Sequence, residues 1–243
     1  MRAALIALAL LLTGCAAGGS NPLPPPAPPP AGPPSAVRPG VVVFTANWQQ
    51  DTIGVGCGED VPPTCAGTAT WLTFPRPGTQ GYACVDPKPN ACLELLGDRL
   101  RVKNAVPGFP LISQQTFNAT EGMSIEAVVS AICRDPGCFI GPVIFDGELD
   151  YGGLYLDAAA DGVRVRAYRP AVACELPGHH YPAGTTVALR VDYDGAGYRF
   201  VVNGSPASAP GCEDDPLKHD PRAALFAGGV DGYVERLDVT IGK

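Results

Sequence analysis

Apolar and polar residues alternate with a period of two along several stretches in the second half of this 243-residue chain. Such alternation is typical of β-strands that bury one face and expose the other. The same region shows no helical period with caps at its ends. The pattern therefore predicts antiparallel strands, with the clearest ones at 124–131, 163–166, 187–193 and 236–241.

Turn-forming dipeptides separate these stretches at short intervals. Asp, Asn and Gly accept the positive φ values that tight hairpin turns require. Many short strands joined by such turns, over about 200 residues, predict an all-β sandwich or barrel with meander connections. The dipeptides are Asp146-Gly147, Asp161-Gly162, Asp194-Gly195, Asn203-Gly204 and Asp231-Gly232.

Composition and charge narrow the class of protein. The chain holds 30 Gly and 27 Pro, two residues that suit neither long helices nor central strands. Hydrophobic residues make up 46% of the chain, which is enough for a substantial core. The net charge of −7 gives an average field that repels phosphate, so nucleic acid is not expected as a partner.

The N-terminal fifteen residues carry an export signal. Arg2 precedes a ten-residue apolar run, residues 3–12, that is too short to span a bilayer. Leu12-Thr13-Gly14-Cys15 follows directly and resembles a bacterial lipobox, which implies that Cys15 is lipidated. The alternative is an ordinary secretory signal that contains a cysteine. Either interpretation predicts export, and the first predicts a lipid anchor in the bacterial cell envelope, with the protein facing the periplasm or the exterior.

A proline-rich segment follows the lipobox. Ten of the nineteen residues in 21–39 are proline, a composition that favours polyproline II and forms no core. We expect residues 16–40 to be a disordered tether, although such a segment can also be a ligand for domains that bind polyproline II. The remaining residues, 41–243, are predicted to form one β-sandwich domain.

Cysteine usage agrees with export. Without Cys15, eight cysteines remain, and an even number in an oxidising compartment indicates disulfides. Zinc is disfavoured, because no spacing is Cys-x-x-Cys and the chain has only 3 His. Loop-closure entropy favours the pairs that are close in sequence. The expected bridges are Cys57 with Cys65, Cys84 with Cys92, Cys133 with Cys138 and, by elimination, Cys174 with Cys212. We expect Pro136-Gly137 to turn the chain, so that the Cys133–Cys138 bridge pins a hairpin between neighbouring strands.

The order of these segments resembles the concanavalin A-like lectin/glucanase superfamily, particularly its LamG-like domains. The resemblance lies in an expected strand from Phe117 through Met123 to Ala127, in residues 151–156, in the hairpin 187–204 that ends in Asn203-Gly204, and in the final strand 229–239. It implies a disulfide-bonded jelly-roll sandwich of two antiparallel sheets. It also implies carbohydrate, or another surface component, as a non-covalently bound partner.

Glu148 and Asp150 raise the alternative of a glycoside hydrolase. Residues two apart on a strand point the same way, and a carboxylate pair can cleave a glycosidic bond. The segment resembles the Glu-x-Asp-x-Glu motif of the superfamily's glucanases, but Gly152 stands where the last acid is expected. A solvated turn is the competing interpretation. A third hypothesis is a structural or adhesion protein with no small ligand.

Aromatic and imidazole side chains are the candidate ligand contacts, because aromatic rings stack on sugar faces and imidazoles hydrogen-bond to hydroxyls. His179-His180-Tyr181 is expected in a loop between strands, with no third ligand nearby for a transition metal. Calcium is the cofactor left open, through loop acids such as Asp157, Asp161, Asp192, Asp194, Asp214, Asp215 or Asp231, although none has the spacing of a calcium loop. The predicted ligand contacts are Tyr151, Tyr168, His179 and Tyr181.

Overall fold

Strands make up the whole regular structure of the residues that the computed structural model describes, and no helix occurs among them. Consequently, none of these residues belongs to a helix able to cross a membrane. The described residues, which belong to one compact unit, are 41–51, 53–55, 71–73, 92–103, 109–118, 122–133, 136–146, 151–214, 217 and 220–242.

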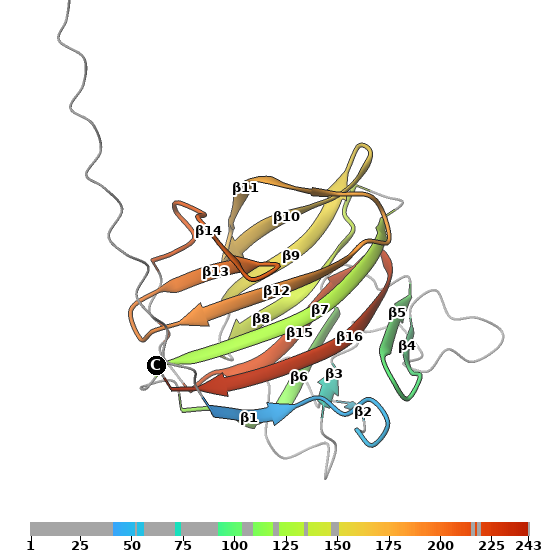
Figure 1. Ribbon diagram of the computed structural model, residues 1–243. Coiled ribbons are helices and arrows are strands. Elements are labelled where there is room, and N and C mark those ends of the chain that lie inside the picture. Colours follow the sequence, from blue (N-terminus) through green and yellow to red (C-terminus); the bar gives the residue numbers. More distant parts are fainter. Residues whose placement is uncertain are drawn as a thin grey trace, which may run out of the picture. The chain divides into compact units, whose positions relative to one another are not determined.

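The strands form two stacked sheets (Figure 1). Their bounds are β1 Val41–Thr45, β2 Ile53–Val55, β3 Trp71–Thr73, β4 Cys92–Leu95, β5 Leu100–Lys103, β6 Phe109–Thr116, β7 Met123–Cys133, β8 Phe139–Phe145, β9 Tyr151–Ala159, β10 Gly162–Arg169, β11 Val172–Tyr181, β12 Thr186–Tyr193, β13 Tyr198–Val202, β14 Ser205–Ala207, β15 Arg222–Gly228 and β16 Val230–Ile241.

The first sheet has the order β14-β13-β12-β7-β16-β5-β4, with β1 also paired to β16. The second sheet has the order β11-β10-β9-β8-β15-β6-β3-β2. All pairings are antiparallel except that of β2 with β3. The predicted all-β, two-sheet antiparallel sandwich of the jelly-roll type is therefore confirmed.

The core lies between the sheets and is filled by alternate residues of each strand. On β7, Ile125, Ala127, Val129 and Ala131 are buried, as their period of two predicted. Their counterparts on the second sheet include Leu154 and Leu156 of β9. Each fully buried aliphatic side chain of this kind contributes about 1.5 to 3 kcal/mol to folding, so the alternation itself selects which face turns inward.

The two C-terminal strands lie in the middle of the sheets rather than at an edge. β16 pairs with β7 over its whole length, with Leu237 opposite Ala127, and β15 inserts between β8 and β6. Figure 1 shows β16, in red, beside β7, in green. The meander expected from the turn spacing therefore holds only for local hairpins, such as those from β8 to β11 and from β12 to β14.

One predicted turn is wrong. Asp231-Gly232 lies inside β16, and the chain turns instead at Gly229, whose φ is +57°. Gly232 serves close packing: a Cβ at this position would lie 2.5 Å from the Ser130 carbonyl oxygen on β7. The glycine is therefore needed because two backbones approach each other here.

A second expectation, a strand running from Phe117 into Met123, is also wrong at its start. β6 ends at Thr116, and β7 begins only at Met123. Phe117 is buried, and its amide donates to the Pro221 carbonyl at 2.8 Å. The side chain of Phe117 thus anchors the connection while its backbone amide bonds outside either sheet.

The described residues contain two disulfides, Cys133–Cys138 and Cys174–Cys212, both as predicted. The first does not pin a hairpin, contrary to expectation, because β7 and β8 belong to different sheets. It closes the corner where the chain passes from one sheet to the other. The Cys57–Cys65 and Cys84–Cys92 pairs involve Cys57, Cys65 and Cys84, which lie outside the described residues, as do residues 1–15 with Cys15 and the tether 16–40.

Candidate ligand-binding face

The outer faces of the two sheets differ in chemistry. The outer face of the first sheet carries ion pairs, in which Arg236 contacts Glu126 and also Asp238, with Nε to Oδ2 at 3.1 Å. Arg190 contacts Asp192 in the same way, at 3.0 Å. The outer face of the second sheet also carries ion pairs, but it gathers a cluster of aromatic rings beside them, so the second sheet holds the candidate site.

Alternation along β8, β9, β10 and β15 brings these rings together. Residues such as Ile140 and Leu154 point into the core, and their strand neighbours point outward. The resulting group, called the aromatic face below, consists of Phe139 and Phe145 on β8, Tyr151 and Tyr155 on β9, Tyr168 on β10 and Phe226 on β15.

Tyr155 is the most deeply buried ring of the aromatic face. Its side chain is only 4% exposed, and its ring centroid lies 4.8 Å from that of Tyr168 and 5.2 Å from that of Phe139. A Cβ on Gly153 would lie 3.0 Å from both the Tyr155 hydroxyl and Val143 Cγ2. The absence of a side chain at Gly153 is therefore what allows the Tyr155 ring to lie along the sheet.

A second ring group lies toward the other end of the same strands. Phe226 contacts Tyr151 at 5.7 Å and Phe145 at 5.8 Å between ring centroids. Tyr151, Phe226, Phe139 and Tyr168 are each only partly buried. They therefore combine fixed positions with ring surface that a ligand can reach.

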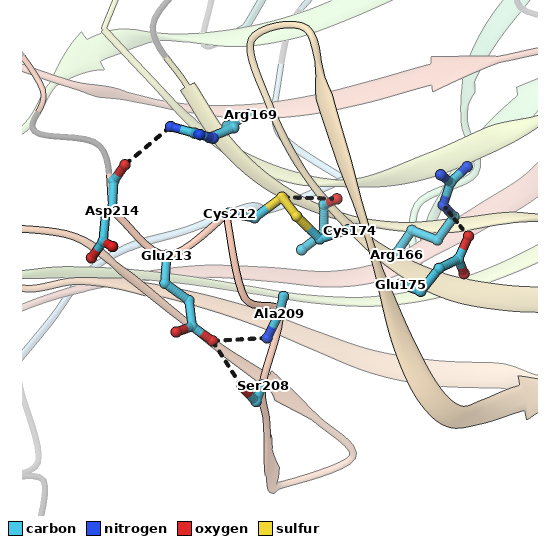
Figure 2. Close-up of a disulfide and its surroundings, with 10 residues drawn as sticks. Arg166, Arg169, Cys174, Glu175, Ser208, Ala209, Cys212, Glu213 and Asp214 are labelled. Atoms are coloured by element: carbon cyan, nitrogen blue, oxygen red, sulfur yellow. Dashed lines mark hydrogen bonds and ion pairs between the residues drawn. A yellow bond between two sulfur atoms is a disulfide. The ribbon is translucent and has the colours of Figure 1, made fainter.

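Charged groups adjoin the aromatic face and hold Tyr168. The Tyr168 hydroxyl donates to Asp157 Oδ2 at 2.5 Å, and Arg166 Nη1 donates to both groups at 3.1 Å. Arg166 Nε lies 3.1 Å from Glu175 Oε1, which also pairs with Arg164 at 3.5 Å. These five residues are called the guanidinium–carboxylate network below, and Figure 2 shows its Arg166–Glu175 pair.

The Cys174–Cys212 disulfide supports the strand that carries Glu175. It joins β11, an edge strand of the second sheet, to the segment after β14 of the first sheet. In Figure 2 the bridge lies between the Arg166–Glu175 pair and the segment that bears Glu213. Glu213 stabilises that segment by accepting bonds from the Ala209 amide at 2.8 Å and the Ser208 hydroxyl at 3.1 Å.

Three phenols of the aromatic face are held in their neutral form. Burial raises the pKa of Tyr151 and raises that of Tyr155 well above the ordinary value. Burial also raises the pKa of Tyr168, and the hydrogen bond and negative charge of Asp157 add to the rise, while Arg166 and Arg164 oppose it. The raised pKa keeps the Tyr168 hydroxyl protonated, and able to donate to Asp157, up to a higher pH than an exposed phenol.

The four predicted ligand contacts fall into two places. Tyr151 and Tyr168 share the aromatic face, whereas His179 and Tyr181 lie within β11 and not in a loop as expected. Gly178, with φ of +85°, forms a bulge that turns Tyr181 toward the core. Tyr181 Oη lies 3.3 Å from His179 Nδ1 and accepts from Asn203 Nδ2 at 3.3 Å.

The carboxylates of the other hypotheses do not assemble into a site among the described residues. Glu148, Asp150 and Asp215 lie outside those residues. Within the described ranges, no three His, Cys, Asp or Glu side chains come together as metal ligands. Most of the acids considered for calcium have partners: Asp157 with Arg166, Asp161 with His180, Asp192 with Arg190, Asp194 with Arg199, Asp231 with Arg101.

Sequence reasoning missed most of the aromatic face. Phe139, Phe145 and Phe226 lie in strands that are apolar on both faces, so no alternation marks which residues point outward. The sequence does contain a signal for Tyr155 and Asp157. Both lie an even number of residues after Tyr151, so on one strand all three side chains point to the same face. Their cross-strand partner Arg166 follows only from the register of β9 with β10.

Comparison with solved structures shows which known folds this chain resembles. No family model matches the chain, and no curated protein matches it. A solved structure from work on endo-acting O-glycanases that human gut bacteria express to initiate mucin breakdown aligns with a TM-score of 0.57 and 9% identity, covering 84% of this chain and 100% of that one. The GH43 protein BlXynB of Bacillus licheniformis aligns with a TM-score of 0.52 and 12% identity, covering 81% of this chain and 39% of that one. At these identities the shared property is the β-sandwich fold.

Proposed function

We propose that the protein binds carbohydrate non-covalently and that the aromatic face of the second sheet is the binding surface. The observation that carries the proposal is the partial exposure of Tyr151 and Tyr168 around the buried ring of Tyr155. Aromatic rings pack against the apolar C–H faces of sugars, and a rigid ring loses little conformational entropy on binding. The chemistry of this face thus matches a pyranose ring.

Hydroxyl groups of a bound sugar also need partners. The guanidinium–carboxylate network adjoins the rings and offers guanidinium donors and carboxylate acceptors in fixed positions. Because a hydroxyl both donates and accepts, it can join such a network without a net change of charge. The likeness of the fold to an O-glycanase structure and a GH43 protein supports the same ligand class.

Affinity electrophoresis of the full chain in mild detergent, in gels that contain neutral β-glucan, xylan or galactomannan, tests the proposal. We expect retardation by at least one polymer, and we expect Tyr151→Ala and Tyr168→Ala each to weaken it about tenfold, equivalent to about 1.4 kcal/mol. Tyr233→Ala is the matched control, since Tyr233 is a partly buried tyrosine on β16 that contacts Arg99 and Arg101.

Unaltered retardation in both tyrosine variants would remove the aromatic face from consideration. Incubating the chain with the same polymers and assaying for new reducing ends tests the hydrolase alternative. The Glu148→Gln variant would abolish any product that Glu148 helps to form. A chain that binds no polysaccharide but retains a protein partner would favour the structural alternative.

The proposal includes the setting of the protein. Export and lipidation at Cys15, followed by the tether 16–40, would hold the domain at the bacterial cell envelope. The lipobox resemblance and the even number of remaining cysteines support this location. Labelling of cells with a radioactive fatty acid should mark the wild-type chain and leave the Cys15→Ser variant unlabelled.

A further inference from the structure

The guanidinium–carboxylate network combines two positive and two negative side chains at the border of the aromatic face. Arg164 and Arg166 come from β10, Asp157 from β9 and Glu175 from β11. The antiparallel register places Arg164 opposite Asp157 and Arg166 opposite Glu175. Each guanidinium therefore meets an acid that the sheet itself brings into position, and the charges balance.

Arg166 is held between two carboxylates. Its Nη1 contacts Asp157 Oδ2 and its Nε contacts Glu175 Oε1, both at 3.1 Å. The Asp157 side chain is 12% exposed, whereas that of Glu175 is 56% exposed. Glu175 is thus the more exposed of the two negative charges, and its Oε1 contacts both arginines at the surface.

An anionic sugar would meet an unfavourable arrangement here. A uronate or sulfate that pairs with Arg164 or Arg166 would come close to Glu175, whose Oε1 contacts both guanidinium groups, and at Arg166 it would also come close to Asp157. Like charges brought together without compensation oppose binding, whereas a neutral hydroxyl can bond to either sign. The face is therefore built to select against a negative ligand.

We infer that the glycan bound by the aromatic face is uncharged, and that Glu175 is the residue that determines this selectivity. This inference rests on the proposed function. The bound ligand is a neutral polysaccharide, and the guanidinium–carboxylate network disfavours acidic polysaccharides. Glu175 acts by occupying Arg164 and Arg166, so it is a specificity-determining residue.

The test compares neutral and acidic polymers on one protein. Affinity electrophoresis of the full chain uses β-glucan, xylan and galactomannan as neutral probes, and polygalacturonate and alginate as acidic probes. We expect the wild type to bind a neutral polymer at least tenfold more tightly than either acidic one. Because the contact is uncharged, added salt should change the neutral affinity less than twofold.

The Glu175→Gln variant removes the negative charge that contacts both arginines and keeps the shape of the side chain, while Arg166 retains its contact with Asp157. We expect it to raise the ratio of polygalacturonate affinity to neutral affinity at least tenfold, with that gain lost at high salt. Glu126→Gln is the matched control, because it likewise removes one of the two carboxylates that contact an arginine, here Arg236 on the other sheet, away from the aromatic face. It should leave the ratio at the wild-type value.

The outcomes separate the two proposals. Acidic polymers that bind the wild type as tightly as neutral ones, or an unchanged ratio in Glu175→Gln, would overturn the inference and leave carbohydrate binding standing. Absence of binding to every polymer by wild type and variants alike would overturn the proposed function, and the inference with it. The melting temperature of each variant is measured alongside, and the exposure of Glu175 predicts no loss of folding.

Discussion

Removing the Cys174–Cys212 disulfide should destabilise the protein more than removing Cys133–Cys138. The perturbations are the double variants Cys174→Ser/Cys212→Ser and Cys133→Ser/Cys138→Ser. The bridges close loops with sequence separations of 38 and 5 residues. In the chain-entropy description, loops of these lengths contribute about 4 and about 2 kcal/mol at 25 °C, because the longer loop restricts the unfolded chain more.

Packing terms largely cancel in this comparison. Cys212 and Cys138 are both almost fully buried, at 0% and 1% exposed, so both variants lose a buried sulfur. The remaining difference of about 2 kcal/mol corresponds to a melting temperature lower by about 4 to 8 °C for the Cys174/Cys212 variant in a domain of this size. Both variants should keep the sandwich, since Cys133 and Cys174 take part in the strand ladders through their backbones, which the substitutions leave unchanged.

Differential scanning calorimetry of wild type and both variants at one scan rate measures the difference. Peptide mapping without reductant checks that the other bridges are unchanged. Equal midpoints, or a lower midpoint for the Cys133/Cys138 variant, would refute loop entropy as the source of stabilisation. Peptide maps that link Cys133 to Cys174 or Cys212 would refute the pairing itself.

Two further results are expected. Gly232→Ala should destabilise the fold by about 1 to 3 kcal/mol in chemical denaturation, because the added Cβ would lie 2.5 Å from a backbone oxygen. Gly137→Ala is the control and should change stability little, because a Cβ there would have no atom within 4 Å. Similar losses in both variants would contradict the close-approach argument. Alkaline titration should show Tyr151, Tyr155 and Tyr168 ionising at higher pH in the native protein than in the unfolded chain. Folding raises the pKa of these three phenols above the unfolded value of 10.0, so their contribution to stability is complete below pH 10 and is lost as the pH rises through the native pKa values. Coincident phenolate titration curves for the native and unfolded protein would contradict this.

The sequence alone determined the class of fold, because that class depends on local patterns. The period of two in 124–131 and 187–193 identified buried strand faces, and the burial of Ile125 and Leu189 agrees. Cysteine spacing identified the Cys133–Cys138 disulfide, since short loops close at low entropic cost, and elimination then assigned Cys174 to Cys212. Half of the candidate ligand contacts, Tyr151 and Tyr168, also share one face.

Only the tertiary structure decided which strands are neighbours and what lies on the outer faces. β15 and β16 enter the middle of the sheets through pairings that join residues about a hundred positions apart, and no local signal encodes such partners. Phe139 and Phe226 lie in strands that are apolar on both faces, so their outward direction follows from packing against the opposite sheet. The contact of Arg166 with Asp157 and Glu175 depends on the register of three strands, and register is set by the burial of the whole sheet rather than by any one segment.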